Sequence, residues 1–249
     1  MAEPVLALQG LTKAFGALKV TQGVDLSIAP GELHALIGPN GAGKTTLVHQ
    51  ISGTLRADAG RIVFCGQDIT HLPPQKRARA GLARTFQITS TIASLSAIEN
   101  VALGVQARSA HPLSPFRRAA DDEALNTPAW EALEAVGLAA RAHAPAGSLS
   151  HGEKRALEIA MALTLQPRLI LLDEPLAGVG HEEGEKLIEL LQSLKGRFAM
   201  LLVEHDMSAV FALADRVTVL VYGGVIASGD PAAVRADPAV RQAYLGEEV

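Results

Sequence analysis

The stretch LHALIGPNGAGKTT, residues 33–46, sets an apolar run directly before a glycine-rich turn. Within it, Gly38, Gly43, Lys44 and Thr45 meet the spacing G-x-x-x-x-G-K-[ST]. Backbone N–H groups at such a turn can hold phosphate oxygens, because glycine has no Cβ to obstruct their approach. A helix that begins near Lys44 adds unpaired N–H groups and about half a positive charge at its N-terminus. The stretch therefore predicts a buried strand, a phosphate-binding loop and a helix, rather than a glycine-rich turn that binds nothing.

A second strand pattern, Leu169–Leu172, ends in two carboxylates, Asp173 and Glu174. Ionised carboxylates are costly to bury unless they are paired or bind a metal. In a chain that also has a phosphate loop, Asp173 can face a Mg²⁺ ion, and Thr45 can offer an oxygen to the same ion. Glu174 can then orient or deprotonate the water that attacks the γ-phosphate. The alternative is a strand end that simply emerges into solvent.

The composition describes a globular protein and excludes several other classes. Of the 249 residues, 48% are hydrophobic and 19% are charged, and the net charge of −4 offers no basic field for nucleic acid. The single cysteine, Cys65, fits a reducing compartment. We expect no signal peptide at the N-terminus, and no apolar run approaches the roughly 18 residues of a membrane span. Any membrane association is therefore expected to come through a partner protein.

Strand and helix patterns alternate on both sides of a segment that is helical throughout. After residue 150 the periodicity predicts helices over 150–165, 182–195 and 207–213, and strands over 169–172, 199–203 and 216–221. Shorter strands are expected at 5–8, 24–28 and 61–64. Between 88 and 147 the period is that of helices, interrupted by a loop over 110–118. The alternation favours an α/β fold with a mostly parallel sheet and a helical insertion.

Three further features complete an ordered set. Gln87 lies beyond the phosphate loop, the segment LSHGE at 149–153 precedes a predicted helix, and His205 follows the strand over 199–203. This order of loop, glutamine, signature segment, Asp-Glu and histidine resembles an ABC-type ATPase subunit over nearly the whole chain. The resemblance implies a P-loop NTPase fold with a mostly parallel core sheet, an N-terminal antiparallel β subdomain and an inserted α-helical subdomain. It implies a single ABC ATPase domain over 1–249, made of a RecA-like core with the β subdomain (1–87 and 148–249), the insertion (88–147) and a C-terminal helical tail (230–249).

The resemblance also assigns the contacts to ATP. Phe15 would stack on adenine, although a phenylalanine in the core is the ordinary alternative. Ser150, Gly152 and Glu153 would contact an ATP molecule held by a second subunit. The phosphates would lie against the loop residues Gly38, Pro39, Asn40, Gly41, Ala42, Gly43, Lys44, Thr45 and Thr46.

For hydrolysis, the resemblance implies that Glu174, His205 and Gln87 act on the water and the γ-phosphate. Mg²⁺ would be bound by Thr45, Gln87 and Asp173. Because the γ-phosphate is the ligand that both subunits share, ATP would join two subunits and its hydrolysis would separate them.

The chain departs from the family pattern at two places. The common signature is Leu-Ser-Gly-Gly-Gln, whereas His151 and Glu153 occupy its third and fifth positions here. Gly180 stands where an aspartate is usual, which concerns a contact between subunits rather than the nucleotide pocket.

Four stretches look like the ATPase subunit of importers for branched-chain, hydrophobic amino acids: GLARTFQ at 81–87, LSAIENVALG at 95–104, LSHGEKRALEIAMAL at 149–163 and DPAVRQAYLGEE at 237–248. Such a subunit works with membrane permease subunits, a second ATPase subunit (identical or different) and, indirectly, a periplasmic substrate-binding protein. It lies on the cytoplasmic face of the bacterial inner membrane, and no nucleic acid is expected. A helical stripe would either form a groove for a permease helix or fill the local core: Ile88, Ile92, Leu95 and Ile98.

Other functions remain open at this level. Importers of urea, amides or aromatic acids and exporters of lipopolysaccharide use similar ATPases. ABC-type ATPases that act on nucleic acid or ribosomes usually carry tandem nucleotide domains or long coiled coils, neither of which this sequence shows. A small-molecule kinase or a GTPase would leave the signature segment unexplained.

Overall fold

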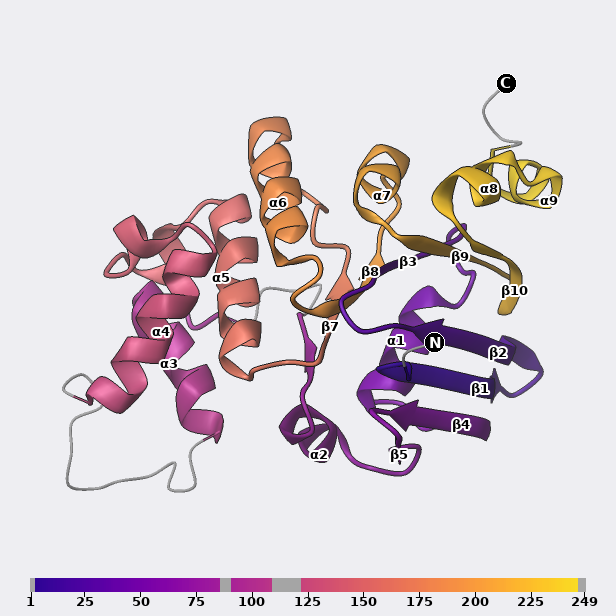
Figure 1. Ribbon diagram of the computed structural model, residues 1–249, viewed down its shortest axis with the longest axis horizontal. Helices are drawn as coiled ribbons and strands as arrows, with labels where there is room; N and C mark the ends of the chain where they lie inside the picture. Colours follow the sequence, from indigo (N-terminus) through magenta and orange to yellow (C-terminus); the bar gives the residue numbers. More distant parts are fainter. Residues whose placement is uncertain (1–2, 86–90, 109–121, 246–249) are drawn as a thin grey trace. The chain divides into compact units, whose positions relative to one another are not determined.

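The glycine-rich turn lies between a central strand, β3 (Leu33–Ile37), and a helix, α1 (Lys44–Ser52), as the sequence predicts. These elements belong to a computed structural model that describes residues 3–85, 91–108 and 122–245 (Figure 1). The chain divides into two compact units. The first comprises 1–84, 168–174 and 192–249, and the second comprises 85–167 and 175–191.

The first unit is built on a six-stranded sheet with the order β10-β9-β3-β8-β7-β6. Its other strands are β6 (Leu82–Arg84), β7 (Leu169–Asp173), β8 (Ala199–Val203), β9 (Arg216–Val221) and β10 (Gly224–Gly229). All neighbours are parallel except β10, which pairs with β9 in an antiparallel hairpin. Every residue of β3, β7 and β8 is buried, as expected for parallel strands that are covered on both faces.

The register of this sheet brings three strand ends to one edge. Leu36 pairs with Val203, and Asp173 pairs with the same Val203 from the other side. The carboxyl ends of β3, β8 and β7 therefore lie next to one another, with β8 in the middle. Whatever follows these strands emerges at a single edge of the sheet, where ligands of open α/β sheets commonly bind.

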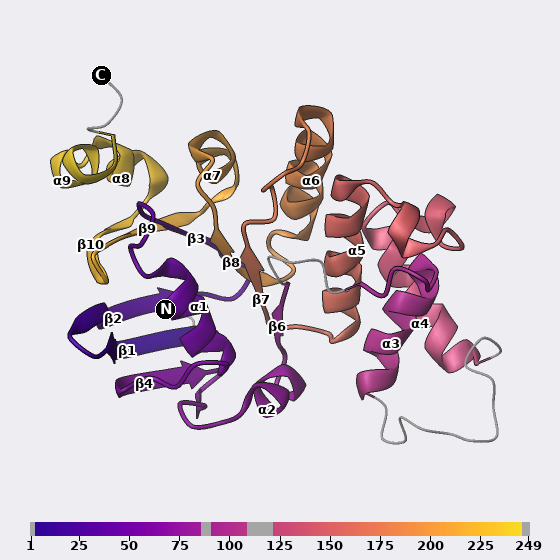
Figure 2. The same ribbon diagram turned by 180° about the vertical axis from the view of Figure 1, so that it is seen from behind.

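An antiparallel sheet with the order β2-β1-β4-β5 completes the first unit. Its strands are β1 (Leu6–Phe15), β2 (Leu18–Ile28), β4 (Ala59–Phe64) and β5 (Gln67–Asp68). The first two form one long hairpin where the sequence predicts strands only at 5–8 and 24–28. Their pairing shifts register at irregularities near Gly10, which has a φ of 59°, and such bulges interrupt the alternation on which a strand prediction depends. Residues of α1 join both sheets in one core, among them Leu47, Val48 and Ile51 (Figure 2).

A buried arginine closes the end of α1. Arg77, in α2 (Pro74–Arg79), is 2% exposed, and burial lowers the pKa of its guanidinium. The guanidinium donates to the carbonyl oxygens of Gln50 at 2.8 Å and Ile51 at 2.7 Å, in the last turn of α1. It also donates to Thr70 and Leu72. One side chain thus satisfies carbonyl groups at the helix C-terminus, where an α-helix leaves them without intrahelical partners.

We expect Arg77→Ala to lower the free energy of unfolding by about 3 kcal/mol, because buried carbonyl groups lose their donors. Urea denaturation followed by circular dichroism measures the change. Arg79→Ala is the matched control, since Arg79 is exposed on the same helix and its loss should change stability by less than about 0.5 kcal/mol. Equal stability of the two variants would contradict the role of Arg77.

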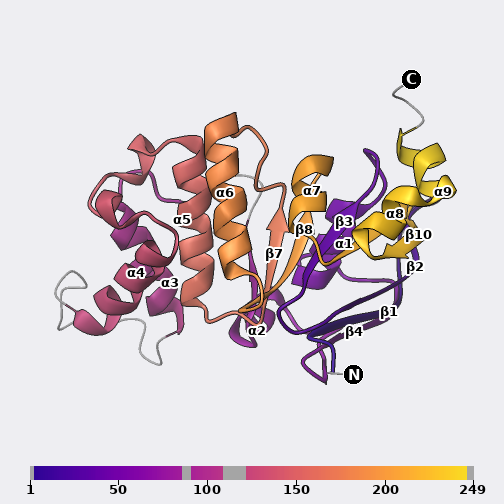
Figure 3. The same ribbon diagram turned by 45° about the horizontal axis from the view of Figure 1, so that its top comes forward.

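The second unit is helical. Its helices are α3 (Ala97–Arg108), α4 (Glu123–Ala135), α5 (His151–Thr164) and the part of α6 (His181–Leu194) up to Leu191. Short 3₁₀ turns at Ala139–Arg141 and Ala146–Ser148 lead into α5. Helices α3, α4 and α5 pack on one another (Figure 3), and each buries an apolar side chain completely: Val101, Leu133 and Leu157. This unit contains the described part of the segment 88–147 together with α5.

The remaining helices belong to the first unit: α7 (Met207–Leu213), α8 (Pro231–Ala236), α9 (Pro238–Val240) and a last turn over Arg241–Leu245. Asp230 and Asp237 cap α8 and α9 by accepting hydrogen bonds from backbone N–H groups. Across the described part of the chain, every helix is too short or too polar to cross a bilayer.

Candidate active site

Two glycines of the loop are required by the packing of the chain itself. A Cβ on Gly38 would collide with the carbonyl oxygen of Leu220 in β9, and one on Gly43 would collide with that of Val20 in β2. Both residues have positive φ, 156° and 103°. A Cβ on Gly41 would meet nothing within 4 Å, so only its backbone conformation, with a φ of 79°, favours glycine there. Access for phosphate is thus only part of the reason for this glycine pattern.

The loop and the start of α1 form a cradle for an anion. Gly43 is the N-cap residue of α1, and among the described residues no side chain caps this helix. The N–H groups of its first turn can therefore bind an anion at the positive end of the helix dipole. Thr45 is exposed at this turn, so its hydroxyl can reach a bound ion. The residues present thus fit a nucleotide phosphate with its Mg²⁺ ion.

Lys44 reaches back over the loop. Its side chain is buried, and Nζ donates to the carbonyl oxygens of Gly38 at 2.6 Å and Pro39 at 3.1 Å. Burial lowers the pKa of the Lys44 ammonium, while the charges of Glu174 and Asp173 oppose that shift. The cation of the loop and the two carboxylates predicted from the sequence therefore interact at one edge of the sheet.

Asp173 is held by an arginine to which the sequence pattern assigns no role. Asp173 is 2% exposed, and Arg84 Nη2 lies 3.1 Å from its Oδ2. Arg84 also donates from Nη1 to Ser52 Oγ at 3.2 Å. It ends β6, a strand of three residues that pairs with β7. A strand this short gives no clear periodicity, and the only signal was its place three residues before Gln87 in the stretch GLARTFQ.

Glu174 adopts an uncommon backbone conformation. Its φ is 49°, in the left-handed region, and its N–H donates to the Val203 carbonyl oxygen at 2.9 Å. Such a conformation costs a residue other than glycine about 1–3 kcal/mol, and it is found most often at functional sites. The chain bends sharply here, between the end of β7 and the segment that leads to α6.

His205 and Phe15 are both accessible. His205 follows β8, and its side chain is 64% exposed. The backbone N–H of His205 donates to the neighbouring Glu204 carboxylate at 3.1 Å. Phe15 ends β1 and is 51% exposed, with Lys13 Nζ 5.4 Å from the ring centroid. Phe15 is thus not a core residue, and about half of it is accessible. Gln87 lies outside the described residues.

The signature segment forms the start of α5 in the second unit. Ser150 caps the helix, and the contacts with Glu153 are reciprocal: Glu153 N–H donates to Ser150 Oγ at 3.1 Å, and Ser150 N–H donates to Glu153 Oε2 at 2.9 Å. Glu153 Oε1 also lies 3.2 Å from Arg141 Nε. Glu153 therefore completes a capping box, a role open to glutamate and glutamine alike.

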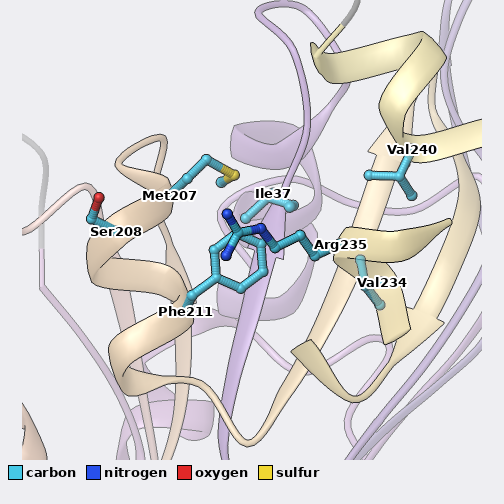
Figure 4. Close-up of a pocket in the computed structure, with 7 residues that line it drawn as sticks. All are labelled: Ile37, Met207, Ser208, Phe211, Val234, Arg235 and Val240. Carbon is cyan, nitrogen blue, oxygen red and sulfur yellow. The ribbon is translucent and has the colours of Figure 1, made fainter. Parts of the chain in front are cut away.

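A small hollow of about 250 Å³ in the first unit is lined by residues of β3, of α7 and of the C-terminal helices α8 and α9 (Figure 4). Ile37, which immediately precedes Gly38, lines it together with Met207 and Ser208, which follow His205. Val234, Arg235 and Val240 line it from α8 and α9. The Arg235 guanidinium lies over the ring of Phe211, 5.4 Å from its centroid. The C-terminal helices thus pack beside the strand that carries the phosphate loop and the helix that follows His205.

Two family models and several known proteins are similar to this chain. The family model described as "ABC transporter" matches residues 21–177, and that described as "Branched-chain amino acid ATP-binding cassette transporter" matches 225–249. The high-affinity branched-chain amino acid transport ATP-binding protein LivG of Escherichia coli K12 is 38% identical over 256 residues, which cover 99% of this chain and all of LivG.

Two solved structures are similar in fold. The ADP conformation of MJ1267, an ATP-binding cassette of an ABC transporter, has a TM-score of 0.88 and 31% identity, covering 98% of this chain and 100% of that chain. The dimeric post-hydrolysis state of the cassette MJ0796, bound to ADP and Pi, has a TM-score of 0.76 and 25% identity, covering 91% of this chain and 98% of that chain.

Proposed function

The chain belongs to the ABC transporter family as an ATP-binding cassette, and on this premise we propose that it is the ATP-hydrolysing subunit of an importer for branched-chain amino acids. Similarity to LivG over the full length of both chains supports this cargo class. The match of residues 225–249 to a branched-chain transporter family supports it independently, because this segment lies outside the part matched by the general family model.

In this proposal the loop binds the triphosphate. The first-turn N–H groups of α1 hold the phosphate oxygens, and Lys44 exchanges its two loop carbonyls for the β- and γ-phosphates. The other loop residues predicted to contact ATP, from Gly38 to Thr46, supply backbone N–H groups or hydroxyls around them, except Pro39, which has neither. Phe15 stacks on adenine from the end of β1.

Asp173, Thr45 and Gln87 are the proposed residues for Mg²⁺, which neutralises charge on the phosphates when it is bound. Arg84 fixes the Asp173 carboxylate in position. Glu174 orients the water and accepts its proton, while His205 contacts the γ-phosphate. The observation that carries this assignment is that burial lowers the pKa of Lys44 and the charges of Glu174 and Asp173, at the end of β7 on the edge of the sheet where β3 also ends, oppose that shift.

A second copy or a close relative completes the site. Ser150 and Gly152 at the start of its α5 are the proposed ligands of the γ-phosphate, because a helix N-terminus with small residues suits an anion. Glu153 acts there by holding Ser150 in its capping position. The dimeric form of the similar cassette MJ0796 supports an arrangement of this kind. The site is then made from two chains, and ATP drives their association.

The proposed partners are membrane permease subunits, with a periplasmic binding protein acting through them, and the proposed place is the cytoplasmic face of the inner membrane. The second unit offers a hollow of about 710 Å³ that includes Leu95 and Ile98, two residues expected either to receive a permease helix or to fill the local core. Leu103 and Trp130 also line it and are 39% and 37% exposed. Ile92 is 47% exposed, and Ile88 lies outside the described residues. Exposed apolar side chains around a hollow suit an apolar helix face.

Transport assays test the proposed function. The chain is co-expressed with its neighbouring permease genes, the complex is reconstituted in vesicles with the matching binding protein, and uptake of labelled leucine is measured with ATP inside. We expect ATP-dependent leucine uptake that excess isoleucine or valine suppresses. Uptake of urea, amides or aromatic acids instead, or copurification with ribosomes or DNA and no permease, would replace the proposal with one of its alternatives.

Phe15→Ala should weaken ATP binding by about 1–3 kcal/mol, because the adenine loses its stacking partner. Calorimetry with a non-hydrolysable ATP analogue measures the loss. Leu18→Ala is the matched control, since Leu18 pairs with Phe15 across the same hairpin and is 66% exposed. If both variants bind like the parent, Phe15 does not stack on the base.

A further inference from the structure

The anion site of the signature segment is already engaged by a carboxylate of the same chain. Gly152 N–H donates to Glu183 Oε2 at 3.0 Å. Glu183 lies in the first turn of α6, and both residues belong to the second unit. The close approach requires glycine, because a Cβ on Gly152 would lie 2.7 Å from Glu183 Cβ and 3.0 Å from the carboxylate carbon. Together they line one hollow with Ser150 and Lys186.

Ser150 engages the same carboxylate. Its hydroxyl oxygen accepts the Glu153 N–H, so its single proton is left to donate elsewhere. A hydrogen bond from the Ser150 hydroxyl, with the one from Gly152, lowers the pKa of Glu183, and the charges of His151 and Lys186 act in the same direction. Glu183 is therefore ionised at neutral pH and takes up the two donors that the proposed function assigns to the γ-phosphate.

We propose that Glu183 is a built-in competitor of ATP: its carboxylate holds the Ser150 and Gly152 donors, and the γ-phosphate of an ATP on the partner subunit must displace it before the two subunits close. This inference rests on the proposed function, because it concerns the same donors. The Gly152 N–H and the Ser150 O–H cannot each form a full hydrogen bond to a carboxylate and to a phosphate at the same time. Two anions at one helix N-terminus would also repel each other.

The surroundings allow the exchange. Glu183 is only half-buried, so its side chain can swing out without disturbing the core. Lys186 lies one turn further along α6 and is exposed, and a glutamate can pair with a lysine at this i,i+3 spacing. Released from α5, the carboxylate therefore has a cation on its own helix. Glu183 sets a threshold for closure, so that subunits lacking a bound triphosphate stay apart.

The test compares ATP-driven dimer formation in hydrolysis-deficient chains. The parent is E174Q, and the variant E174Q/E183Q keeps an oxygen acceptor but loses the charge. Size-exclusion chromatography with light scattering gives the ATP concentration at half-maximal dimer. We expect this concentration to fall by about tenfold or more, since hydrogen bonds to a charged group are the stronger kind. E174Q/E183A should shift at least as far, and E174Q/E182Q, which removes an exposed charge one residue away, should match the parent within about twofold.

ADP affinity distinguishes competition from a merely structural role. ADP has no γ-phosphate, so its affinity should be the same in the parent and in E174Q/E183Q. An unchanged or higher ATP requirement in E174Q/E183Q overturns the inference and leaves the proposed function standing. Should E174Q itself remain monomeric at saturating ATP, the proposed two-subunit site fails first, and the role of Glu183 fails with it.

Discussion

Replacing Lys44 with alanine should reduce ATP affinity by about 100-fold or more. The loop loses its ammonium group, and a charge-assisted hydrogen bond to each of two phosphates is worth about 1.5–3 kcal/mol. The helix N-terminus and the backbone N–H groups remain, so weak binding should persist. Isothermal calorimetry with ATP and Mg²⁺ measures the affinity directly.

Lys76→Ala is the control for this loss. Lys76 is exposed in α2, so this variant removes one positive charge that lies outside the proposed phosphate site. Circular dichroism checks that Lys44→Ala is folded, because the variant leaves the carbonyl oxygens of Gly38, which is buried, and Pro39, which is half-buried, without the ammonium donor. ATP affinity of Lys44→Ala equal to that of Lys76→Ala would remove Lys44 from the phosphate site.

Glu174→Gln should slow ATP hydrolysis by roughly 100- to 10,000-fold while ATP still binds. Glutamine has nearly the shape of glutamate and should tolerate the same left-handed backbone, but its amide cannot accept a proton from the attacking water. The phosphate cradle is unchanged, so ATP should accumulate on the enzyme and hold a dimer together. Phosphate release measures turnover, and light scattering after gel filtration with ATP measures the dimer.

The matched control is Glu189→Gln, which makes the same change at an exposed position of α6. Its turnover should equal that of the parent, and it should show no ATP-stabilised dimer. Turnover of Glu174→Gln close to that of the parent, with monomer only, would assign the activation of water to another residue, with His205 as the next candidate.

The candidate site could be predicted where its residues are adjacent in the chain. The glycine loop, the Asp-Glu pair and the signature segment are each continuous, so spacing and the neighbouring strand or helix pattern were enough to propose them as parts of the site. Arg84 and Glu183 could not be found in this way. Arg84 meets Asp173 across 89 positions of sequence, and Glu183 meets Gly152 across 31. A charged residue far from its partner has no local mark that distinguishes it from a solvated surface residue.

The sequence predicted the bounds of some elements correctly, and the structure adds a second reason for two of its glycines. The strand over 199–203 and the helix over 207–213 have the bounds expected, because each is a short, sharply limited apolar pattern. The β1–β2 hairpin was predicted only at its ends, since bulges and glycines at positive φ interrupt its alternation. Gly38 and Gly43 were assigned to phosphate access, and the carbonyl groups of Leu220 and Val20 supply a second reason that only the packed chain reveals.

By itself, then, the sequence determined which segments are strands and helices around the glycine-rich loop and which side chains we propose for the chemistry, because these depend on local spacing and periodicity. The tertiary structure alone decided that β8 lies between β3 and β7, so that Lys44 interacts with Asp173 and Glu174 at a common edge. It also decided that Arg84 holds Asp173 and that Glu183 occupies the donors of Ser150 and Gly152. Strand order and such pairings arise from hydrogen bonds and packing between distant segments, and these form only when the whole chain folds.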